Sequence, residues 1–315
     1  MKKKIIGACV IVVMMSMLMS SCFTGIESTK KITDKDVEKI TQIKSEQAVS
    51  ESKYNSVEID SFPNWTEGKS FEVADDNLKR VLQQVAGGRM DTLSLKGKEL
   101  KYVGYFEESV LDNEPNVNLR FNDGTNEYVY RTQKTVQQIK EGNIFLQVPF
   151  LIDLDMVEAY RALLVGKSLY LRTSIWYNDQ GEMIKGKKYV KVKINEVTTG
   201  DKVFPLRVLF EADGGEKASV YMSTKQSSVQ NRMFDNLFSE SDIRLNFPLI
   251  SDENWTNIVN GTVAMDMTKE ECRLSLGNPN TIQERPTYDG LQEYWFYTDG
   301  MYLMFFDGLL KQYRK

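Results

Sequence analysis

The sequence predicts an α+β protein that is rich in β-structure. We expect two related small β-barrel or β-sandwich units, followed by a C-terminal domain that combines one helix with a three-stranded meander. Three observations support this fold class: one pattern of strand, turn and strand occurs twice, Asp-Gly turns separate short apolar runs, and a capped helix precedes the last of these runs.

The N-terminus has the order of a bacterial export signal. Lys2–Lys4 form a short basic run, residues 5–19 are mostly apolar, and Ser20 and Ser21 precede Cys22. The apolar run is shorter than the roughly 20 residues that a membrane-spanning helix needs. An ordinary signal peptide with an incidental cysteine would share this order, so the residues next to the cysteine decide between the two alternatives.

Residues 19–22, Met-Ser-Ser-Cys, resemble the bacterial lipobox, in which an apolar residue and small residues precede the cysteine. The resemblance implies that the signal peptide 1–21 is removed and that Cys22 is acylated on its thiol and on its new amino group. The acyl chains would then anchor the protein stably to membrane lipid. Phe23 follows the cysteine, where Asp is the inner-membrane retention signal of some bacteria, and this favours the outer membrane.

Composition excludes several classes of function. The full chain has a net charge of −4, and removal of the signal takes away three lysines and no acid, so the remaining chain is more acidic still. Such a chain is a poor candidate for binding nucleic acid, and it lacks the polybasic patch that binds anionic lipid. The sequence has no histidine, which excludes histidine-based nucleophilic catalysis and histidine metal sites. We expect neither a metal ion nor a cofactor.

Cysteine usage is equally informative. Cys9 leaves with the signal and Cys22 carries lipid, so only Cys272 remains and no disulfide can form within the folded part. Without histidine to activate it, Cys272 is expected to be a buried helix residue and not a nucleophile.

The chain divides by composition into a signal, a tether and three folded parts. The tether is rich in Ser, Lys, Glu, Asp and Thr and has few large apolar residues, which is typical of a flexible segment. The expected ranges are 22–61 for the tether, 62–150 for the first β-rich unit, 151–250 for the second and 251–315 for the C-terminal domain.

A diverged repeat links the two β-rich units. Residues 95–132 and 164–224 both open with Leu-x-Gly-Lys-x-Leu, and both then have a strand that ends in Phe, an Asp-Gly turn and a return strand with Val-Tyr. The second copy adds a hairpin around residues 178–181. Bacterial SH3-like barrels have a similar size and pattern, which is an analogy only.

Helices are expected at three places in these units. Asp75 or Asp76 can cap one that carries Leu78–Val85, and one helix follows each return strand. The expected apolar faces of these two helices carry the residue pairs Val136 and Ile139, and Val229 and Met233.

Three acidic residues at the boundary between the copies allow two interpretations. Asp153, Asp155 and Glu158 could bind calcium or act as a carboxylate pair. Alternatively, Asp155 and Glu158 form a capping box for a helix that buries one face of residues 157–164 and ends at Gly166. The spacing favours the capping box.

The C-terminal segment gives the sharpest local signal. Thr268 and Glu271 match a capping box, and Met267 and Cys272 occupy the positions of a hydrophobic staple. Gly277 follows the last helical residue. Beyond a polar loop, two Asp-Gly turns separate three apolar strands, which predicts an antiparallel meander that packs one face against the helix.

This segment resembles the SmpA/OmlA, or BamE-like, family of small outer-membrane lipoproteins. The matching pieces are Met267–Glu271, Leu276–Pro279, Trp295–Tyr297 and Leu303–Gly308, although Asp266 stands where the family usually has Gly. The resemblance implies a small α+β sandwich and supports an outer-membrane location. We expect Trp295, Tyr297 and Phe305 to be core residues, the alternative being a binding patch.

Together these observations favour a non-catalytic, lipid-anchored envelope protein that binds an envelope protein partner as an assembly or scaffold factor. Two alternatives remain open. One is a binder of glycans or small ligands that uses aromatic residues such as Trp176 and Tyr177. The other is an envelope hydrolase that uses Asp153 and Asp155 as acid and base.

Overall fold

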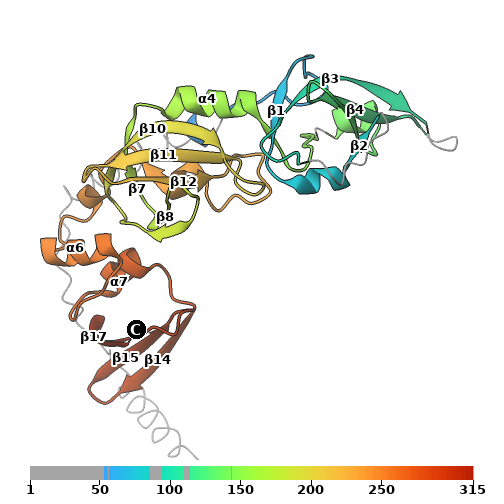
Figure 1. Ribbon diagram of the computed structural model, residues 1–315. Coiled ribbons are helices and arrows are strands. Elements are labelled where there is room, and N and C mark those ends of the chain that lie inside the picture. The colour runs from blue at the N-terminus through green and yellow to red at the C-terminus, as the bar shows by residue number, and fades with distance from the viewer. Residues whose placement is uncertain (1–52, 56, 86–93, 110–113, 143, 315) are drawn as a thin grey trace, which may run out of the picture. The chain divides into compact units, whose positions relative to one another are not determined.

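The computed structural model describes residues 53–55, 57–85, 94–109, 114–142 and 144–314 (Figure 1). The expected signal peptide, the expected lipidation site Cys22 and the part of the expected tether up to residue 52 lie outside the described residues. The described chain forms two compact units: a larger one of residues 53–250 with 259–261, and a C-terminal unit of residues 251–258 and 262–314. Two curled sheets make up the larger unit and a small meander sheet belongs to the C-terminal unit, so the expected β-rich α+β class is confirmed at this level.

The first curled sheet has six antiparallel strands in the order β2-β5-β4-β3-β1-β6. Its strands are β1 (Ser70–Val73), β2 (Leu82–Gln84), β3 (Glu99–Glu108), β4 (Asn116–Asn122), β5 (Glu127–Arg131) and β6 (Leu151–Asp153). A bulge between Tyr102 and Gly104 bends the long strand β3. The core inside the curl is aromatic and aliphatic, and includes Phe62, Trp65, Phe71, Tyr102, Phe121 and Tyr128.

The second curled sheet has seven antiparallel strands in the order β13-β7-β10-β11-β12-β8-β9. Its strands are β7 (Ser168–Leu171), β8 (Ile175–Tyr177), β9 (Met183–Lys185), β10 (Lys191–Thr199), β11 (Leu206–Ala212), β12 (Lys217–Met222) and β13 (Phe238–Ser239). Strand β11 alternates buried and half-buried residues along its whole length, as expected for a strand with one face on a core. The expected hairpin around residues 178–181 is confirmed as β8 and β9.

The two curled sheets share a connection and several contacts. Strand β6 pairs with β1 and leads directly into helix α4 (Leu154–Leu164), which packs against β10 of the second sheet. The first sheet therefore extends beyond the expected boundary at residue 150. The Thr199 hydroxyl donates to Glu72 at 2.8 Å, and Tyr54, within the expected tether, is buried in the core of the second sheet. Ordered structure thus begins before residue 62.

The opening turns of the two repeat copies have the same geometry. The carbonyl of Leu95 accepts from the N–H of Lys98 at 2.9 Å, and the carbonyl of Leu164 accepts from Lys167 at 3.1 Å. Gly97 and Gly166 have φ angles of 77° and 83°, a left-handed conformation that favours glycine. The two hairpins β4–β5 and β11–β12 follow at the expected positions.

Two of the expected helices differ from the structure. The prediction of a helix over 78–85 is wrong. The segment η1 (Asp76–Arg80) is a short 3₁₀ turn capped by Asp75, and the chain then enters β2, which pairs with β5. The helix over 229–233 is also wrong, since the next helix is α5 (Phe234–Leu237), and η3 (Ile243–Asn246) follows. The first-copy helix is confirmed as α3 (Val136–Glu141), capped by Thr135.

The C-terminal unit combines two helices with a meander. Helices α6 (Asp252–Asn260) and α7 (Lys269–Leu276) precede four antiparallel strands, and the capping box of Thr268 and Glu271 is confirmed. The strands are β14 (Thr281–Thr287), β15 (Gly290–Phe296), β16 (Tyr302–Phe306) and β17 (Leu309–Arg314). The expected three strands are β15 to β17. Strand β14 escaped prediction because its seven residues are exposed or half-buried and lack apolar alternation.

Asp266 adopts a left-handed conformation with a φ angle of 64°. This is the position at which the resembled family has Gly, and a glycine would adopt that φ without strain. Within the described residues no helix is both long and apolar enough to cross a membrane.

Candidate functional site

The acidic residues at the start of α4 form an ion-pair cluster around Lys69. Asp153 caps the helix by accepting from the N–H groups of Asp155 and Met156, so the expected capping box led by Asp155 is wrong. The Lys69 ammonium lies 2.9 Å from Asp153 and 2.5 Å from Asp155. A cationic group thus already occupies the position between the two carboxylates.

Glu158, the third acidic residue, pairs with Arg161 on the exposed side of α4. In the described part of the chain, no group of three or more Asp, Glu or Cys side chains has the arrangement of a metal site. The ion pairs of Lys69 tie the segment before β1 to the end of β6 and the start of α4.

Burial and hydrogen bonds shift the pKa values of Lys69 and Asp153. The Lys69 side chain is 3% exposed. Burial disfavours its charge, yet hydrogen bonds to Asp155 and Asp153 outweigh that cost and raise the pKa of Lys69. Burial raises the pKa of Asp153 in spite of the nearby ammonium. Lys69 therefore stays charged at neutral pH and serves as a counterion, because a raised pKa leaves even less of the unprotonated amine that a general base needs.

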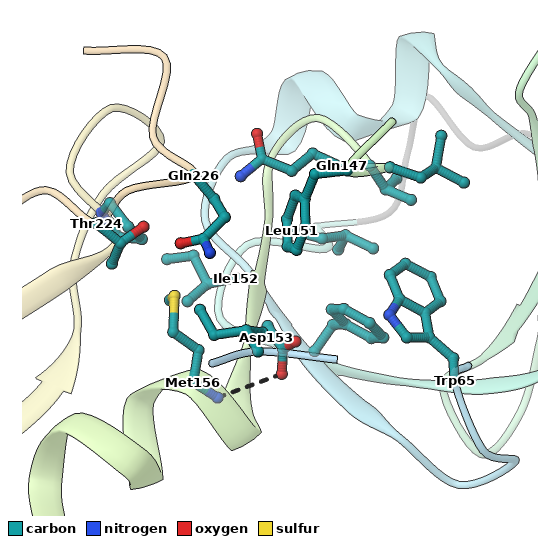
Figure 2. A pocket seen from close by; sticks show the side chains of 14 residues that line it. Trp65, Gln147, Leu151, Ile152, Asp153, Met156, Thr224 and Gln226 are labelled. Atoms are coloured by element: carbon teal, nitrogen blue, oxygen red, sulfur yellow. Dashed lines mark hydrogen bonds between the residues drawn. The ribbon is translucent and has the colours of Figure 1, made fainter. Parts of the chain in front are cut away.

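A small cavity lies between the two curled sheets beside this cluster. Figure 2 shows Leu151 and Ile152 between Trp65 on one side and Gln226 on the other, with Met156 on the side of Gln226. Its volume is about 50 Å³, which suits one or two water molecules and no larger ligand. The cavity alone is not a site for a substrate.

A polar groove opens next to the cavity and shares Ile59, Met156 and Gln226 with it. Its volume is about 510 Å³, within the range of small-molecule sites. The polar lining comes from four separate parts of the chain, and consists of Glu58, Asp60, Ser61, Asn64, Lys69, Asp155, Lys225 and Gln226. Sequence reasoning missed this groove because no local motif joins these segments.

Trp176 and Tyr177 do not form the exposed aromatic platform that the glycan-binding alternative would use. Trp176 is fully buried, its ring lies edge-on to Phe210 at 5.1 Å, and its indole N–H donates to the Thr173 carbonyl. Tyr177 is half-buried, and its ring lies edge-on to that of Tyr221 at 4.7 Å. The alternating pattern of β8 turns Trp176 into the core, as strand geometry requires.

Cys272 is fully buried in α7, as the staple position predicted. Burial raises the pKa of its thiol to about 12, so the nucleophilic thiolate is scarce at neutral pH. Met267, the other staple residue, is also fully buried.

One face of the meander packs against helix α7. The buried residues on this face are Glu293, Trp295, Leu303, Phe305 and Leu310. Lys269 of α7 lies 2.9 Å from Glu293, and the Arg273 guanidinium lies 4.4 Å from the centre of the Trp295 ring. The expected core positions of Trp295 and Phe305 are confirmed, and Tyr297 is half-buried with its hydroxyl donating to the Gly277 carbonyl.

The opposite face of the same sheet, which we term the open face, has no helix against it within the C-terminal unit. Strand register places its residues in three cross-strand rows. The rows run Arg285–Gln292–Phe306–Leu309, Gln283–Tyr294–Met304–Gln312 and Thr281–Phe296–Tyr302–Arg314. The central strands β15 and β16 carry mainly aromatic residues, the edge strands mainly polar ones, and none of these residues is acidic.

Hydrogen bonds hold the aromatic side chains of the open face. The Tyr294 hydroxyl donates to Gln292 at 3.3 Å, and the Gln312 amide donates to the Tyr302 hydroxyl at 2.9 Å. Phe296 is 36% exposed. The surface is therefore an ordered, half-exposed aromatic surface.

Two guanidinium groups mark opposite corners of the open face. Arg285 lies on β14 in the first row and Arg314 on β17 in the third, and both are exposed. Neither has an ion-pair partner among the residues that the structure describes. Two acids of the same strands, Glu284 and Glu293, lie opposite one another on the other face of the sheet, and Asp289, Asp299 and Asp307 lie in the turns between strands.

No family model, no curated protein and no solved structure matches this chain. The resemblance of its C-terminal segment to BamE-like lipoproteins therefore stays a prediction.

Proposed function

We propose that this chain is a non-catalytic envelope lipoprotein that binds a protein partner through the open face of its C-terminal sheet. The composition of that face carries the proposal. Cores of protein–protein interfaces are enriched in Tyr, Phe, Met and Arg and depleted in Asp, Glu and Lys. The open face has this composition, whereas a sheet face that contacts only water is normally polar.

The rest of the proposal comes from sequence. The lipid on Cys22 would hold the chain to the outer membrane, and the acidic tether would let the folded units reach a partner. The two curled sheets are proposed to be related copies, and residues 251–315 to be a BamE-like domain that needs neither metal nor cofactor.

A crosslinking pulldown from native membranes tests this function, with the lipid left in place. Wild-type protein, the unanchored Cys22→Ala variant and Phe296→Ala are compared. We expect wild type to recover one or more envelope proteins, and both variants to recover less. Recovery that is equal for Phe296→Ala and wild type would show that the open face is not the binding surface.

A second candidate function is the binding of a glycan or small polar ligand in the groove beside Lys69. The observation that favours it is the size of the groove and its mixed lining of carboxylates, amides and amines. A glycan screen of the soluble Cys22→Ala protein tests it, with Asn64→Ala as the groove variant. Binding that Asn64→Ala abolishes and Phe296→Ala leaves intact would favour the groove over the open face.

A further inference from the structure

We infer that the partner of the open face is an acidic amphipathic helix, with carboxylates at its two ends and apolar side chains between them. This inference rests on the proposed function, because it specifies what kind of protein segment the same face binds. It depends on the charge of the face, its dimensions and the chemistry of its centre.

The open face differs in charge from the rest of the chain. The whole chain is acidic, with 44 acidic against 40 basic residues, yet the residues that β14 to β17 place on the open face include two arginines and no acid. Arg285 and Arg314 are exposed and have no carboxylate partner among the described residues. An arginine that pairs with a carboxylate across an interface can form two parallel hydrogen bonds. A segment with two carboxylates would supply the counterions that this face lacks.

The open face has about the dimensions of one helix. Three residues on one face of a strand span roughly 14 Å, and four strands at about 4.8 Å spacing span a similar width. The two arginine Cα atoms, at diagonal corners, are therefore about 20 Å apart. A helix is roughly 10 Å wide and rises 1.5 Å per residue, so about 13 residues bridge the diagonal. The face is thus the size of one helix and much smaller than the ~800 Å² that each partner buries in a standard interface.

The opposite face of the same sheet shows that a short helix suffices as a cover. Helix α7 has eight residues and packs on the buried face through Arg273 over Trp295. A helix on the open face would repeat this arrangement on the other side. Its apolar residues would lie over Tyr294, Phe296 and Met304, which form the centre of the face.

The chemistry of the centre argues for a polypeptide and against a lipid surface. Gln283, Gln292 and Gln312 flank the aromatic residues in the same rows. Burying an amide among acyl chains costs free energy because nothing there accepts or donates a hydrogen bond. The polar side chains of a partner helix can satisfy these amides.

A site-specific photocrosslinker tests the inference. p-Benzoylphenylalanine replaces Phe296 in the full lipidated chain, and crosslinked peptides from native membranes are identified by mass spectrometry. We expect a net acidic segment with apolar residues at helical spacing. We also expect the double variant Arg285→Glu, Arg314→Glu to lower the crosslinking yield at least tenfold.

The matched control reverses the charge of two lysines on the outer face of β10, by the substitutions Lys191→Glu and Lys193→Glu. Both lysines are exposed, so this control makes the same change in net charge away from the open face. We expect the crosslinking yield of this control to stay within twofold of the yield of the protein without charge substitutions. Protection of Cys272 from thiol reagents shows that each variant keeps a folded C-terminal unit.

The outcomes separate the inference from the function on which it rests. Crosslinking to a basic or neutral protein segment, or equal losses in both charge variants, would overturn the acidic partner and leave protein binding in place. Crosslinking only to lipid, only to residues 22–52 of the same chain, or to nothing would overturn both.

Discussion

Two antiparallel hairpins of this protein present very different outer faces. The outer face of β10 and β11 in the second curled sheet carries charges of both signs, and Lys193 lies opposite Glu211 in the strand register. The open face of β15 and β16 carries Tyr294 opposite Met304 and Phe296 opposite Tyr302. Both hairpins bury their inner faces, so the requirement for a core is the same in each.

The difference indicates what each outer face contacts. Paired surface charges contribute little to stability, typically 0–1 kcal/mol, and keep a sheet soluble. Aromatic side chains on an outer face do not serve solubility, and a contiguous apolar patch on a soluble protein usually marks an interaction site. This difference agrees with the proposal that the outer face of the curled sheet contacts solvent and that the open face of the meander contacts a partner.

The largest expected effect separates the two faces of the meander itself. Trp295 and Phe296 are neighbours in sequence on opposite faces of β15. Trp295→Ala removes a fully buried ring, its contact with Arg273 and the donor to the buried Glu293 carboxylate. We expect it to lower the free energy of unfolding by roughly 3–5 kcal/mol. Phe296→Ala should cost at most about 1 kcal/mol because its ring is partly in water.

Denaturant unfolding measures this contrast. Cys272, buried under the same sheet, reports the opening of the C-terminal unit through its reactivity with thiol reagents in the Cys22→Ala background. Similar losses of unfolding free energy in Trp295→Ala and Phe296→Ala would mean that the open face is packed as tightly as a core. A segment of the chain itself would then cover it.

A smaller effect concerns acid stability, where the curled sheets and the open face should also differ. Asp123, in the turn between β4 and β5, accepts from the backbone N–H groups of Thr125 and Asn126 and from the Tyr128 hydroxyl. Burial alone would raise its pKa, but these hydrogen bonds hold the pKa at about 2, below the ordinary 3.8. Because the folded pKa is the lower one, this stabilisation is present above about pH 4 and is lost as the pH falls toward 2.

Asp123→Asn should therefore lower stability at pH 7 by about 1–2 kcal/mol and flatten the acid dependence between pH 4 and 2. Urea unfolding at several pH values, followed by tyrosine fluorescence, measures both. If the free energies of unfolding of wild type and variant fall in parallel down to pH 2, Asp123 does not contribute this acid-dependent stabilisation. The open face carries no acid, so its own residues should add no comparable acid dependence.

Local sequence predicted the parts of the fold whose causes are local. The capping box of Thr268 and Glu271 and the Asp-Gly hairpins each depend on residues within a few positions of one another, and all of these were found. Strand β2 was expected to be helical because Leu78, Leu82 and Val85 have helical spacing. The structure instead pairs Leu82–Gln84 with β5, and tertiary pairing of this kind overrides local propensity.

The candidate sites depend on distant residues, and the sequence showed them only in part. Lys69 lies far from Asp153 and Asp155 in the chain, so its role as their counterion was not predictable from their spacing. The open face did leave a signal. Residues 294–296 and 302–306 are apolar at successive positions, and such a run places apolar side chains on both faces of a strand.

The smallest expected effect is on binding, and it compares the two outer faces directly. Met304→Glu puts a carboxylate at the centre of the open face, beside Tyr294 and Gln312. Leu209→Glu makes the same change on the outer face of β11, where Leu209 is half-buried beside the charged residues. We expect Met304→Glu to reduce partner recovery about tenfold, equivalent to ~1.4 kcal/mol. Leu209→Glu should leave recovery unchanged.

Quantitative pulldown from native membranes measures both variants against wild type. Like charges across an interface repel, so the loss in Met304→Glu should shrink as salt is added if the partner is acidic. A loss that is independent of salt would instead point to desolvation of the new carboxylate in an apolar interface. Equal losses in Met304→Glu and Leu209→Glu would remove the distinction between the two faces, because any charge added to an outer strand would then weaken binding.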